Sequence, residues 1–144
     1  MNQTCIFCRI IAGTAARSLV AEDEHAVAFM DIAQLTPGHV LIVPRRHARE
    51  LADLSEDEAA ATFRLVHRVV RAVKASGLRC DGYSVWQNNG RAAGQDVFHV
   101  HFHVIPRFPD DPVRLAFDRT RPRPMRADLD AIALRIAAAL PPST

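Results

Sequence analysis

The chain has 144 residues, of which 49% are hydrophobic and 24% charged, and its formal net charge is +2. This length suits one domain that buries about two-thirds of the surface its unfolded chain exposes. The small net charge argues against nucleic acid as a partner. No apolar run approaches the roughly 18 residues of a membrane span, and residues 1–5 do not read as a signal peptide, so we expect a cytoplasmic protein that contacts no membrane.

Two of the three cysteines, Cys5 and Cys8, form a Cys-x-x-Cys pair near the N-terminus. An odd number of cysteines in a protein expected to be cytoplasmic argues against a disulfide framework. Such a pair serves either redox chemistry or zinc binding, and the short helical stretch expected at residues 8–12 favours zinc. Zinc requires two further ligands. The candidates are His47 and His99, with His25, His39 and His67 as alternatives, although His67 is expected to be exposed on a helix.

Three strands are expected in the first half of the chain, at residues 19–21, 26–32 and 39–43. Pro37 and Gly38 form the turn before the third strand, since proline presets φ at the second turn position and glycine takes a positive φ at the third. The third strand is almost wholly apolar, which predicts a central strand that is buried on both faces.

A long helix is expected to begin at Ser55, because Ser55 and Glu58 have the spacing of a capping box. Acidic residues in its first turn, basic residues in its last turn and Gly77 beyond them agree with the helix dipole and a glycine stop. Apolar residues recur at spacings of four and three, which predicts one buried stripe. The stripe consists of Ala59, Phe63, Val66, Val70 and Val73.

A strand at residues 82–87 and a turn-rich loop at residues 88–94 follow this helix. Because a short loop joins antiparallel neighbours, Asn88 and Gln95 should flank one face of the next strand. Beyond that strand and an irregular, proline-containing stretch, the pattern predicts a terminal helix at about residues 128–140 with apolar residues along one face.

The segment after the loop carries three histidines, His99, His101 and His103, in alternation with apolar residues. Side chains on a strand point to opposite faces with period two, so a strand here places all three imidazoles on one face and the apolar side chains in the core. A merely polar outer face more often carries Thr, Lys, Glu or Ser. The histidines therefore indicate either a metal site or acid–base and nucleophilic chemistry on a phosphate or acyl group.

Residues 99–105, which read His-Val-His-Phe-His-Val-Ile after Gly94 and Gln95, match the motif His-φ-His-φ-His-φ-φ, in which φ is apolar. On this motif the chain resembles the histidine-triad (HIT) superfamily of nucleotide-binding and hydrolysing proteins, most closely its bacterial, zinc-containing branch. The likeness runs from about residue 5 to about residue 107. It includes Ile6-Phe7, residues 29–32, residues 37–39, residues 43–47 and Asn88.

The resemblance implies an α+β, HIT-like fold. This fold has an antiparallel sheet of about five strands, one long helix packed on the sheet and a C-terminal helix. The resemblance also implies a single HIT domain over residues 1–144, with a core at residues 5–107 and a C-terminal extension at residues 108–144. It further implies a homodimer in which the sheets of the two copies continue across the interface.

In this family the middle histidine is the nucleophile. The resemblance therefore implies that His101 attacks the α-phosphorus of a nucleotide, and that water hydrolyses the resulting nucleotidyl-histidine to release a nucleoside monophosphate. His103, with Gln95 and Asn88 by analogy, would stabilise charge on the phosphoryl oxygens. The implied substrate is a purine, AMP-type nucleotide derivative, either a phosphoramidate or a dinucleoside polyphosphate. The alternatives are a catalytic metal held by all three histidines and a non-catalytic nucleotide-binding or adaptor module.

The same likeness assigns a binding pocket and a metal site. Asp31 matches the family carboxylate that holds the ribose hydroxyls. The residues implied to line the base pocket are Ile6, Phe7, Phe29 and Ile32. The residues implied to hold a structural Zn²⁺ are Cys5, Cys8, His47 and His99, a closed tetrahedral set that leaves no position open for water.

One position in the substrate-binding loop departs from the family pattern. Asp96 stands where the phosphoramidases carry a serine that is thought to help protonate the leaving group. An ionised carboxylate only accepts hydrogen bonds. Asp96 could hold a histidine in one tautomer or repel a polyphosphate, so the sequence leaves the preferred leaving group open.

Overall fold

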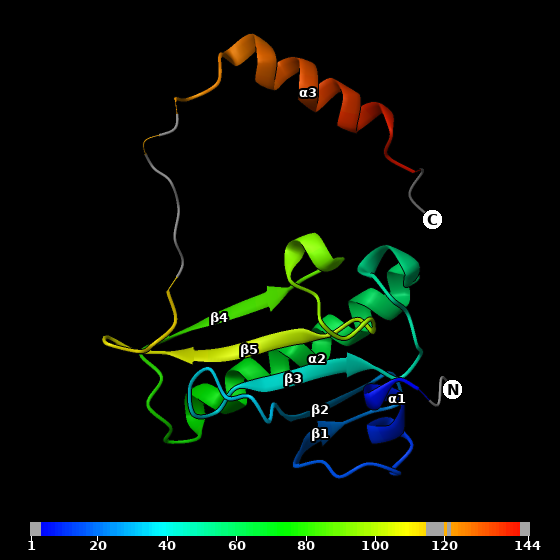
Figure 1. Cartoon of the computed structure of the whole chain (residues 1–144), viewed down its shortest axis with the longest axis vertical. Helices are drawn as coiled ribbons and strands as arrows, with labels where there is room; N and C mark the ends of the chain where they lie inside the picture. The colour runs from blue at the N-terminus through cyan, green and yellow to red at the C-terminus, as the bar shows by residue number, and fades with distance from the viewer. Residues whose placement is uncertain (1–3, 115–119, 121, 142–144) are drawn as a thin grey trace. The chain divides into compact units, whose positions relative to one another are not determined.

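A five-stranded antiparallel sheet forms the frame of the first part of the chain (Figure 1). Its strands are β1 (Leu19–Glu22), β2 (Ala26–Met30), β3 (Val40–Pro44), β4 (Gly82–Gln87) and β5 (Phe102–Arg107). They lie in the order β1-β2-β3-β5-β4, and every neighbouring pair is antiparallel. The computed structural model describes residues 4–114, 120 and 122–141. The predicted α+β fold with five antiparallel strands is confirmed.

Two helices pack on opposite faces of the sheet, the short α1 (Ile6–Ile11) and the long α2 (Glu56–Ala75). The alternation of side chains along β3 separates the two cores. Val40 and Ile42 belong to the apolar cluster that includes α2, whereas Leu41 and Val43 belong to the cluster that includes α1. All five residues of β3 are buried, so the prediction of a central strand buried on both faces is confirmed.

The turn that leads into β3 also has its predicted form. The His39 N–H donates to the Thr36 carbonyl at 3.1 Å, with Pro37 and Gly38 between them. Gly38 has a φ of 95°, and a Cβ at this position would lie 2.8 Å from Cδ1 of Leu78. Only glycine fits here without strain, because the backbone takes a positive φ and the space for a side chain is already filled.

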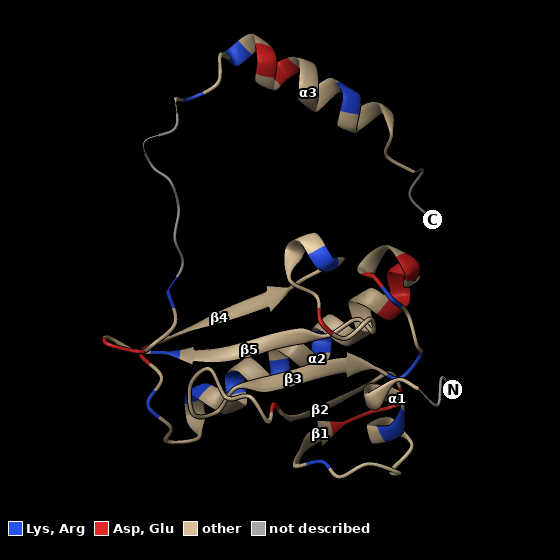
Figure 2. Cartoon of the chain, in the orientation of Figure 1, with Lys and Arg blue, Asp and Glu red and all other residues tan. Residues whose placement is uncertain are grey.

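The capping box of α2 is present as predicted. The Ser55 hydroxyl accepts a hydrogen bond from the Glu58 N–H at 3.2 Å, and the Glu58 carboxylate accepts one from the Ser55 N–H at 2.8 Å. The Glu58 side chain also pairs with Arg46. Acidic residues begin the helix and basic residues follow along it (Figure 2).

The buried stripe of α2 differs from the predicted one. Phe63 is 53% exposed, and its ring meets the edge of the Phe102 ring at 5.9 Å between centroids. The buried residues are Ala61, Thr62, Leu65, Val66, Val69, Val70 and Val73. The small side chains of Ala61 and Thr62 face the sheet in the first half of the helix, which leaves the larger ring of Phe63 at the margin of the stripe.

The strand predicted at residues 26–32 ends earlier, at Met30. The Asp31 N–H still donates to the His39 carbonyl at 3.1 Å, but the Asp31 carboxylate accepts a hydrogen bond from the Ala33 N–H at 2.8 Å, so the chain turns after Asp31. Asp31 and Ile32 therefore stand in the loop between β2 and β3.

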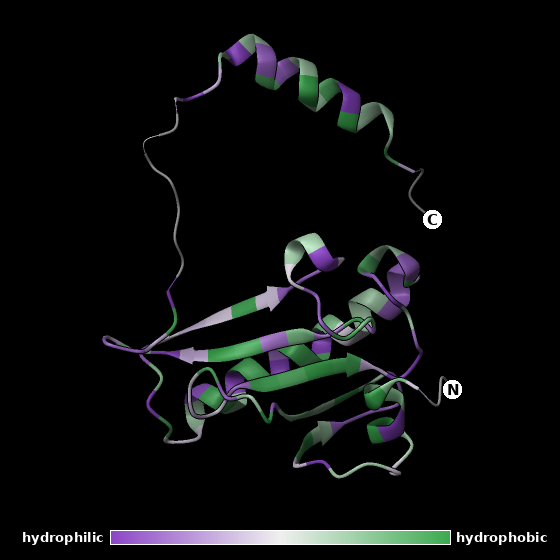
Figure 3. Ribbon diagram, viewed as in Figure 1, coloured by the Kyte–Doolittle hydropathy of each residue, from purple (hydrophilic) through white to green (hydrophobic). Residues whose placement is uncertain are grey.

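The chain divides after Val113 into two compact units. The described part of the second unit holds α3 (Arg126–Ala138), close to the predicted terminal helix at about residues 128–140. Apolar and polar residues are interleaved along α3 (Figure 3), and its apolar side chains, Leu129, Ile132, Leu134 and Ile136, are exposed. The single domain with its core at residues 5–107 stays a prediction. Among the described residues, no helix is both long enough and apolar enough to cross a membrane.

Candidate functional site

The three histidines lie where the chain enters the sheet. The expectation that one strand carries all three is wrong, because β5 begins only at Phe102 and includes His103 alone. Before it the chain bends, and the Val100 N–H donates to the Ala48 carbonyl at 2.8 Å instead of to a neighbouring strand.

Successive side chains nevertheless still point to alternate sides of the sheet through this bend. Val100, Phe102 and Val104 join the apolar core that includes α2. On the other side, the ring of Phe7 from α1 lies 6.1 Å from the ring of His99 and 5.2 Å from that of His101, measured between centroids. The rings of His101 and His103 are 4.9 Å apart. The histidines thus gather on the side of the sheet that faces α1, as the pattern predicted.

His101 is held in one tautomer by the backbone. Its Nδ1 lies 2.7 Å from the carbonyl oxygen of His99, which can only accept a hydrogen bond, so Nδ1 carries the proton. The lone pair of the ring therefore resides on Nε2. With only 6% of its surface exposed, the imidazole has one defined orientation and one basic nitrogen.

His103 has a partner that the sequence did not assign to it. Nε2 of His39 lies 2.9 Å from Nδ1 of His103, and the Leu35 N–H donates to Nδ1 of His39 at 3.4 Å. Because a backbone N–H can only donate, Nδ1 of His39 accepts and its Nε2 carries the proton. His39 then donates to Nδ1 of His103, which leaves His103 with an N–H donor at Nε2.

The sequence offers His39 as an alternative zinc ligand and does not predict its place beside His103. One available signal was its position after the Pro37-Gly38 turn, at the start of a strand expected to be central. The Asp31 carboxylate lies 3.6 Å from Nδ1 of His39, so the loop after β2 contacts this pair as well.

Burial keeps these rings neutral near neutral pH. Burial, followed by the neighbouring His101, lowers the pKa of His103 to about 4. Burial also lowers the pKa of His39, although the nearby Asp31 carboxylate acts in the opposite direction. Neutral His103 is therefore a hydrogen-bond donor that carries no net charge.

The four predicted zinc ligands converge at one point. Sγ of Cys5 lies 3.5 Å from Nδ1 of His99, and Sγ of Cys8 lies 3.4 Å from Nδ1 of His47 and 3.6 Å from that of His99. The two Nδ1 atoms are 3.3 Å apart. Tetrahedral zinc, with Zn–S near 2.3 Å and Zn–N near 2.0 Å, requires separations of about 3.3 to 3.6 Å.

The environment of His99 also suits a metal ligand. Its Nε2 lies 2.9 Å from the Pro44 carbonyl and donates to it, which leaves the Nδ1 lone pair directed at the cysteines. Ligating histidines commonly have such a second partner, which fixes the tautomer. Of the alternative ligands, His25 lies beside Glu24 at 3.2 Å, and His67 is exposed on α2 as expected. The donor set therefore fits zinc.

The Gln95 side chain is occupied by backbone groups of its own loop and of the loop after β3. Its side chain is 2% exposed, accepts from the Gly90 N–H at 2.8 Å and donates to the carbonyls of Arg49 at 2.7 Å and Val97 at 3.1 Å. In this arrangement the amide holds the loop in place.

The other two predicted residues of this loop are more accessible. Asn88 is half-buried, with its Nδ2 3.9 Å from the point that a Cβ on Gly94 would occupy. Asp96 is exposed. Both side chains belong to the segment that leads into the histidines. Because they are partly or fully exposed, they can contact a ligand there.

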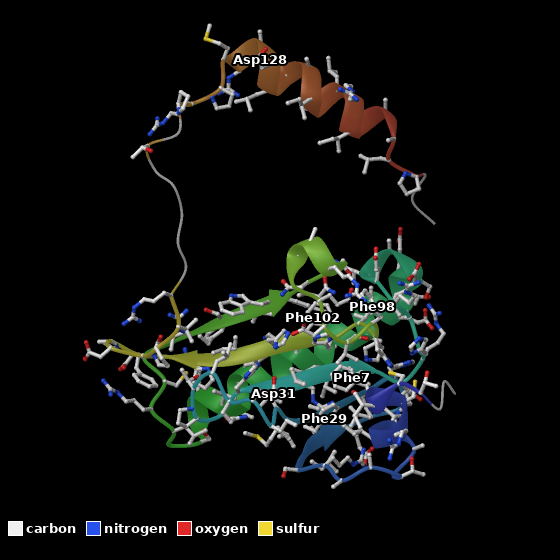
Figure 4. The ribbon with its side chains drawn as sticks, viewed as in Figure 1. Phe7, Phe29, Asp31, Phe98, Phe102 and Asp128 are labelled. Atoms are coloured by element: carbon white, nitrogen blue, oxygen red, sulfur yellow. The ribbon has the colours of Figure 1, made fainter. Side chains whose placement is uncertain are left out.

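The predicted base-pocket residues divide into two groups. Phe7 and Phe29 are buried and meet edge to face with centroids 5.7 Å apart, near the half-buried Asp31 (Figure 4). Ile6 is 41% exposed and Ile32 is fully exposed. The two phenylalanine rings thus form a buried apolar cluster beside His101. The two isoleucines present accessible apolar surface.

Comparison with known proteins gives a consistent result. The family model described as HIT domain matches residues 12–110. A crystal structure of a HIT family protein from Bacillus anthracis superposes with a TM-score of 0.91 at 37% identity, covering 98% of this chain and 100% of that one. The adenosine 5′-monophosphoramidase of Schizosaccharomyces pombe is 41% identical over 104 residues, 72% of this chain and 74% of that protein. A zinc-bound histidine triad family protein from Mycobacterium smegmatis matches with a TM-score of 0.74 at 34% identity, over 95% of this chain and 98% of that one.

Proposed function

This chain belongs to the HIT domain family, and from this premise we propose that it hydrolyses a nucleoside 5′-phosphate derivative through a nucleotidyl-histidine intermediate. The observation that carries the proposal is the state of His101, whose Nδ1 donates to the His99 carbonyl and whose Nε2 lone pair is therefore available. The phosphoramidase activity named for the fission yeast relative supports the same reaction class. Releasing a nucleoside monophosphate, such as AMP, completes the reaction.

In the first step, Nε2 of His101 attacks the α-phosphorus with its lone pair. A phosphorus–nitrogen bond forms while the bond from phosphorus to the leaving group breaks, and the leaving group departs with that electron pair. The hydrogen bond from Nδ1 to the His99 carbonyl stabilises the ring as it becomes positive. The Nε2–H of His103 donates to a phosphoryl oxygen and stabilises the charge that develops there.

In the second step, water attacks the phosphorus in line with the phosphorus–nitrogen bond. A phosphorus–oxygen bond forms, the electron pair of the broken bond returns to Nε2 of His101, and the water proton passes to solvent. The product is the nucleoside monophosphate, and His101 regains its starting state.

The remaining residues would bind the nucleotide. We assign the ribose hydroxyls to the Asp31 carboxylate and the purine base to the Phe7 and Phe29 rings, with Ile6 and Ile32 at the edge of the pocket. These assignments are supported by the contact between the Phe7 and His101 rings and by that between the Phe7 and Phe29 rings. The phosphate end would then meet Asn88 and Asp96 in the loop before the histidines, where Gln95 acts by holding that loop.

We assign the four converging side chains to a structural zinc ion, held by Cys5, Cys8, His47 and His99. Bound there, the ion would link the N-terminal segment to the chain just before His101. With four protein ligands the site is closed, so none of the chemical steps above involves the metal. The zinc-bound family member from Mycobacterium smegmatis supports the assignment.

A homodimer is part of the proposal. β4 is an edge strand of the sheet, and its Tyr83 side chain is 47% exposed. An exposed edge strand can pair with a second copy and extend the sheet. Light scattering coupled to gel filtration tests this, and a mass equal to one chain at micromolar concentration would exclude it.

The decisive experiment compares the wild type with His101→Ala, using adenosine 5′-phosphoramidate and diadenosine polyphosphates. We expect the wild type to release AMP and to show an adenylated species by intact mass. His101→Ala should do neither. His67→Ala is the matched control, because His67 is exposed on α2 and should leave release unchanged. Nucleotide binding by the wild type without release of AMP from any substrate would overturn the proposal in favour of a binding module.

A further inference from the structure

Two arginines share one aromatic ring directly before the histidines. Cζ of Arg49 lies 5.1 Å from the centroid of the Phe98 ring, and Cζ of Arg91 lies 5.4 Å from the same centroid. Both arginines are exposed, and Phe98 is half-buried. Each guanidinium is within the distance at which a cation is attracted to a ring face. The Phe98 ring therefore contacts two guanidinium groups.

Neither arginine makes an ion pair with any of the residues that the structure describes. Five other arginines each pair with a carboxylate: Arg17, Arg45, Arg46, Arg68 and Arg107. Two guanidiniums at one ring, neither of them in an ion pair with a described residue, form a site suited to an anion.

The backbone places both arginines relative to the histidine segment. Gln95 donates to the Arg49 carbonyl at 2.7 Å and accepts from the N–H of Gly90, the residue before Arg91, at 2.8 Å. One buried amide thus fixes the segments that carry both cations. Phe98 precedes His101 by three residues, which span about 10 Å at most. The Cα atoms of Phe98 and His101 therefore lie within about 10 Å of each other.

We propose that Arg49, Phe98 and Arg91 form a subsite for a phosphate chain that continues beyond the α-phosphorus of the substrate. This inference rests on the proposed function, and it specifies the substrate class. The leaving group is then a phosphate or polyphosphate, as in a dinucleoside polyphosphate. The planar fork of arginine matches phosphate oxygens in pairs, which favours such a chain over a single small anion.

The charge of Asp96 would repel a phosphate chain unless the two guanidiniums offset it, but its inability to donate a proton disfavours an amine leaving group. Asp96 is exposed in this loop, and an ionised carboxylate cannot donate a proton. An amine leaving group needs a proton as its bond to phosphorus breaks. A phosphate chain departs with the electron pair as a stable anion and needs none. The two guanidiniums stabilise the charge that this departure leaves on its oxygens.

The test uses two substrates and charge-matched variants of the full chain. The leaving group of diadenosine tetraphosphate is a nucleotide anion, whereas that of adenosine 5′-phosphoramidate is ammonia. For Arg49→Gln and Arg91→Gln combined, we expect kcat/KM for the tetraphosphate to fall about tenfold per arginine, the effect of losing one charge-assisted hydrogen bond each. For the phosphoramidate, kcat/KM should stay within about twofold, since the lost contacts reach only the leaving group.

Arg64→Gln and Arg71→Gln combined remove the same charge from the exposed side of α2 and should change neither rate. Raising the salt concentration should weaken tetraphosphate turnover in the wild type more than in the Arg49 and Arg91 variant. An equal fall for both substrates would overturn the subsite, because the arginines would then act on the shared nucleotide or on the fold. Unchanged tetraphosphate turnover would overturn it as well. Failure of the proposed function can be distinguished from failure of the subsite, because in that case the wild type itself would release no AMP from either substrate.

Discussion

Nε2 of His39 and Nδ1 of His103 lie 2.9 Å apart, in a pair that joins the start of β3 to β5. The two residues are 64 positions apart in the chain. The Leu35 N–H fixes the proton of His39 on Nε2, and this fixes the proton of His103 on the nitrogen that is free to face a substrate. The donor state of His103 is thus set by a residue that need not touch the substrate.

Replacing His39 should therefore impair the chemical step. In His39→Leu, His103 loses its partner and its preferred tautomer, and we expect kcat to fall about 100-fold, as when one transition-state donor is lost. His39→Gln keeps an N–H donor near the Nε2 position and should recover part of the rate. Kinetics on folded protein of both variants check this, and equal rates for Leu and Gln would refute the tautomer argument.

Gln34 should hold the loop that carries both Asp31 and His39. Its side chain accepts from the N–H groups of Gly38 at 2.9 Å and His39 at 3.0 Å, and it donates to the His39 carbonyl at 2.8 Å and to that of Asp31. We expect Gln34→Ala to raise KM for the nucleotide severalfold and to cost about 1–2 kcal/mol of stability.

Gln34→Glu refines this test. A carboxylate keeps the two acceptor bonds but cannot donate, so its KM and its urea midpoint should lie between those of the wild type and the alanine variant. An alanine variant with wild-type KM and stability would show that the loop holds itself without this side chain.

Zinc should contribute to stability more than to turnover. Cys8→Ser removes one of four converging ligands, so we expect a lower Tm with little change in kcat per folded molecule. A chelator should lower the Tm of the wild type but not that of Cys8→Ser. Cys80→Ser is the matched control, because the Cys80 thiol contacts the Gly82 carbonyl at 3.0 Å and lies outside this set. Lost turnover at unchanged Tm would instead place the metal in the chemistry.

Stability should fall between about pH 6.5 and pH 4 because of His103. Burial lowers its pKa in the folded protein to about 4, whereas the unfolded chain takes up the proton near pH 6.5. In this interval the unfolded state binds more protons, so acidification favours unfolding. Urea midpoints for the wild type and His103→Gln across this range check the prediction. The variant should show a flatter pH dependence, and parallel curves would refute the assignment to His103.

Local signals in the sequence predicted local structure well. The capping box at Ser55 and Glu58, the turn at Pro37 and Gly38 and the bounds of β4 agree with the structure, because each depends on neighbours within a few residues. The four converging zinc-ligand candidates came from the family resemblance, and their geometry agrees with it.

The differences arise where distant segments meet. β5 starts late because Val100 bonds to Ala48, about 50 residues earlier, and this contact leaves no local trace. The pairing of His39 with His103 depends on β3 and β5 being neighbours, which spacing along the chain cannot indicate. The position of Phe63 likewise depends on how closely α2 approaches the sheet.

α1 has only 6 residues and covers His101 through the ring of Phe7. A helix this short does not persist alone in water, where fewer than about 12–15 residues are marginal. Its folding and its docking on the sheet are therefore a single equilibrium, and undocking uncovers the nucleophile in the same event. The amide protons of α1 would then exchange with solvent at the rate at which the His101 ring becomes accessible, independently of the global unfolding of the sheet.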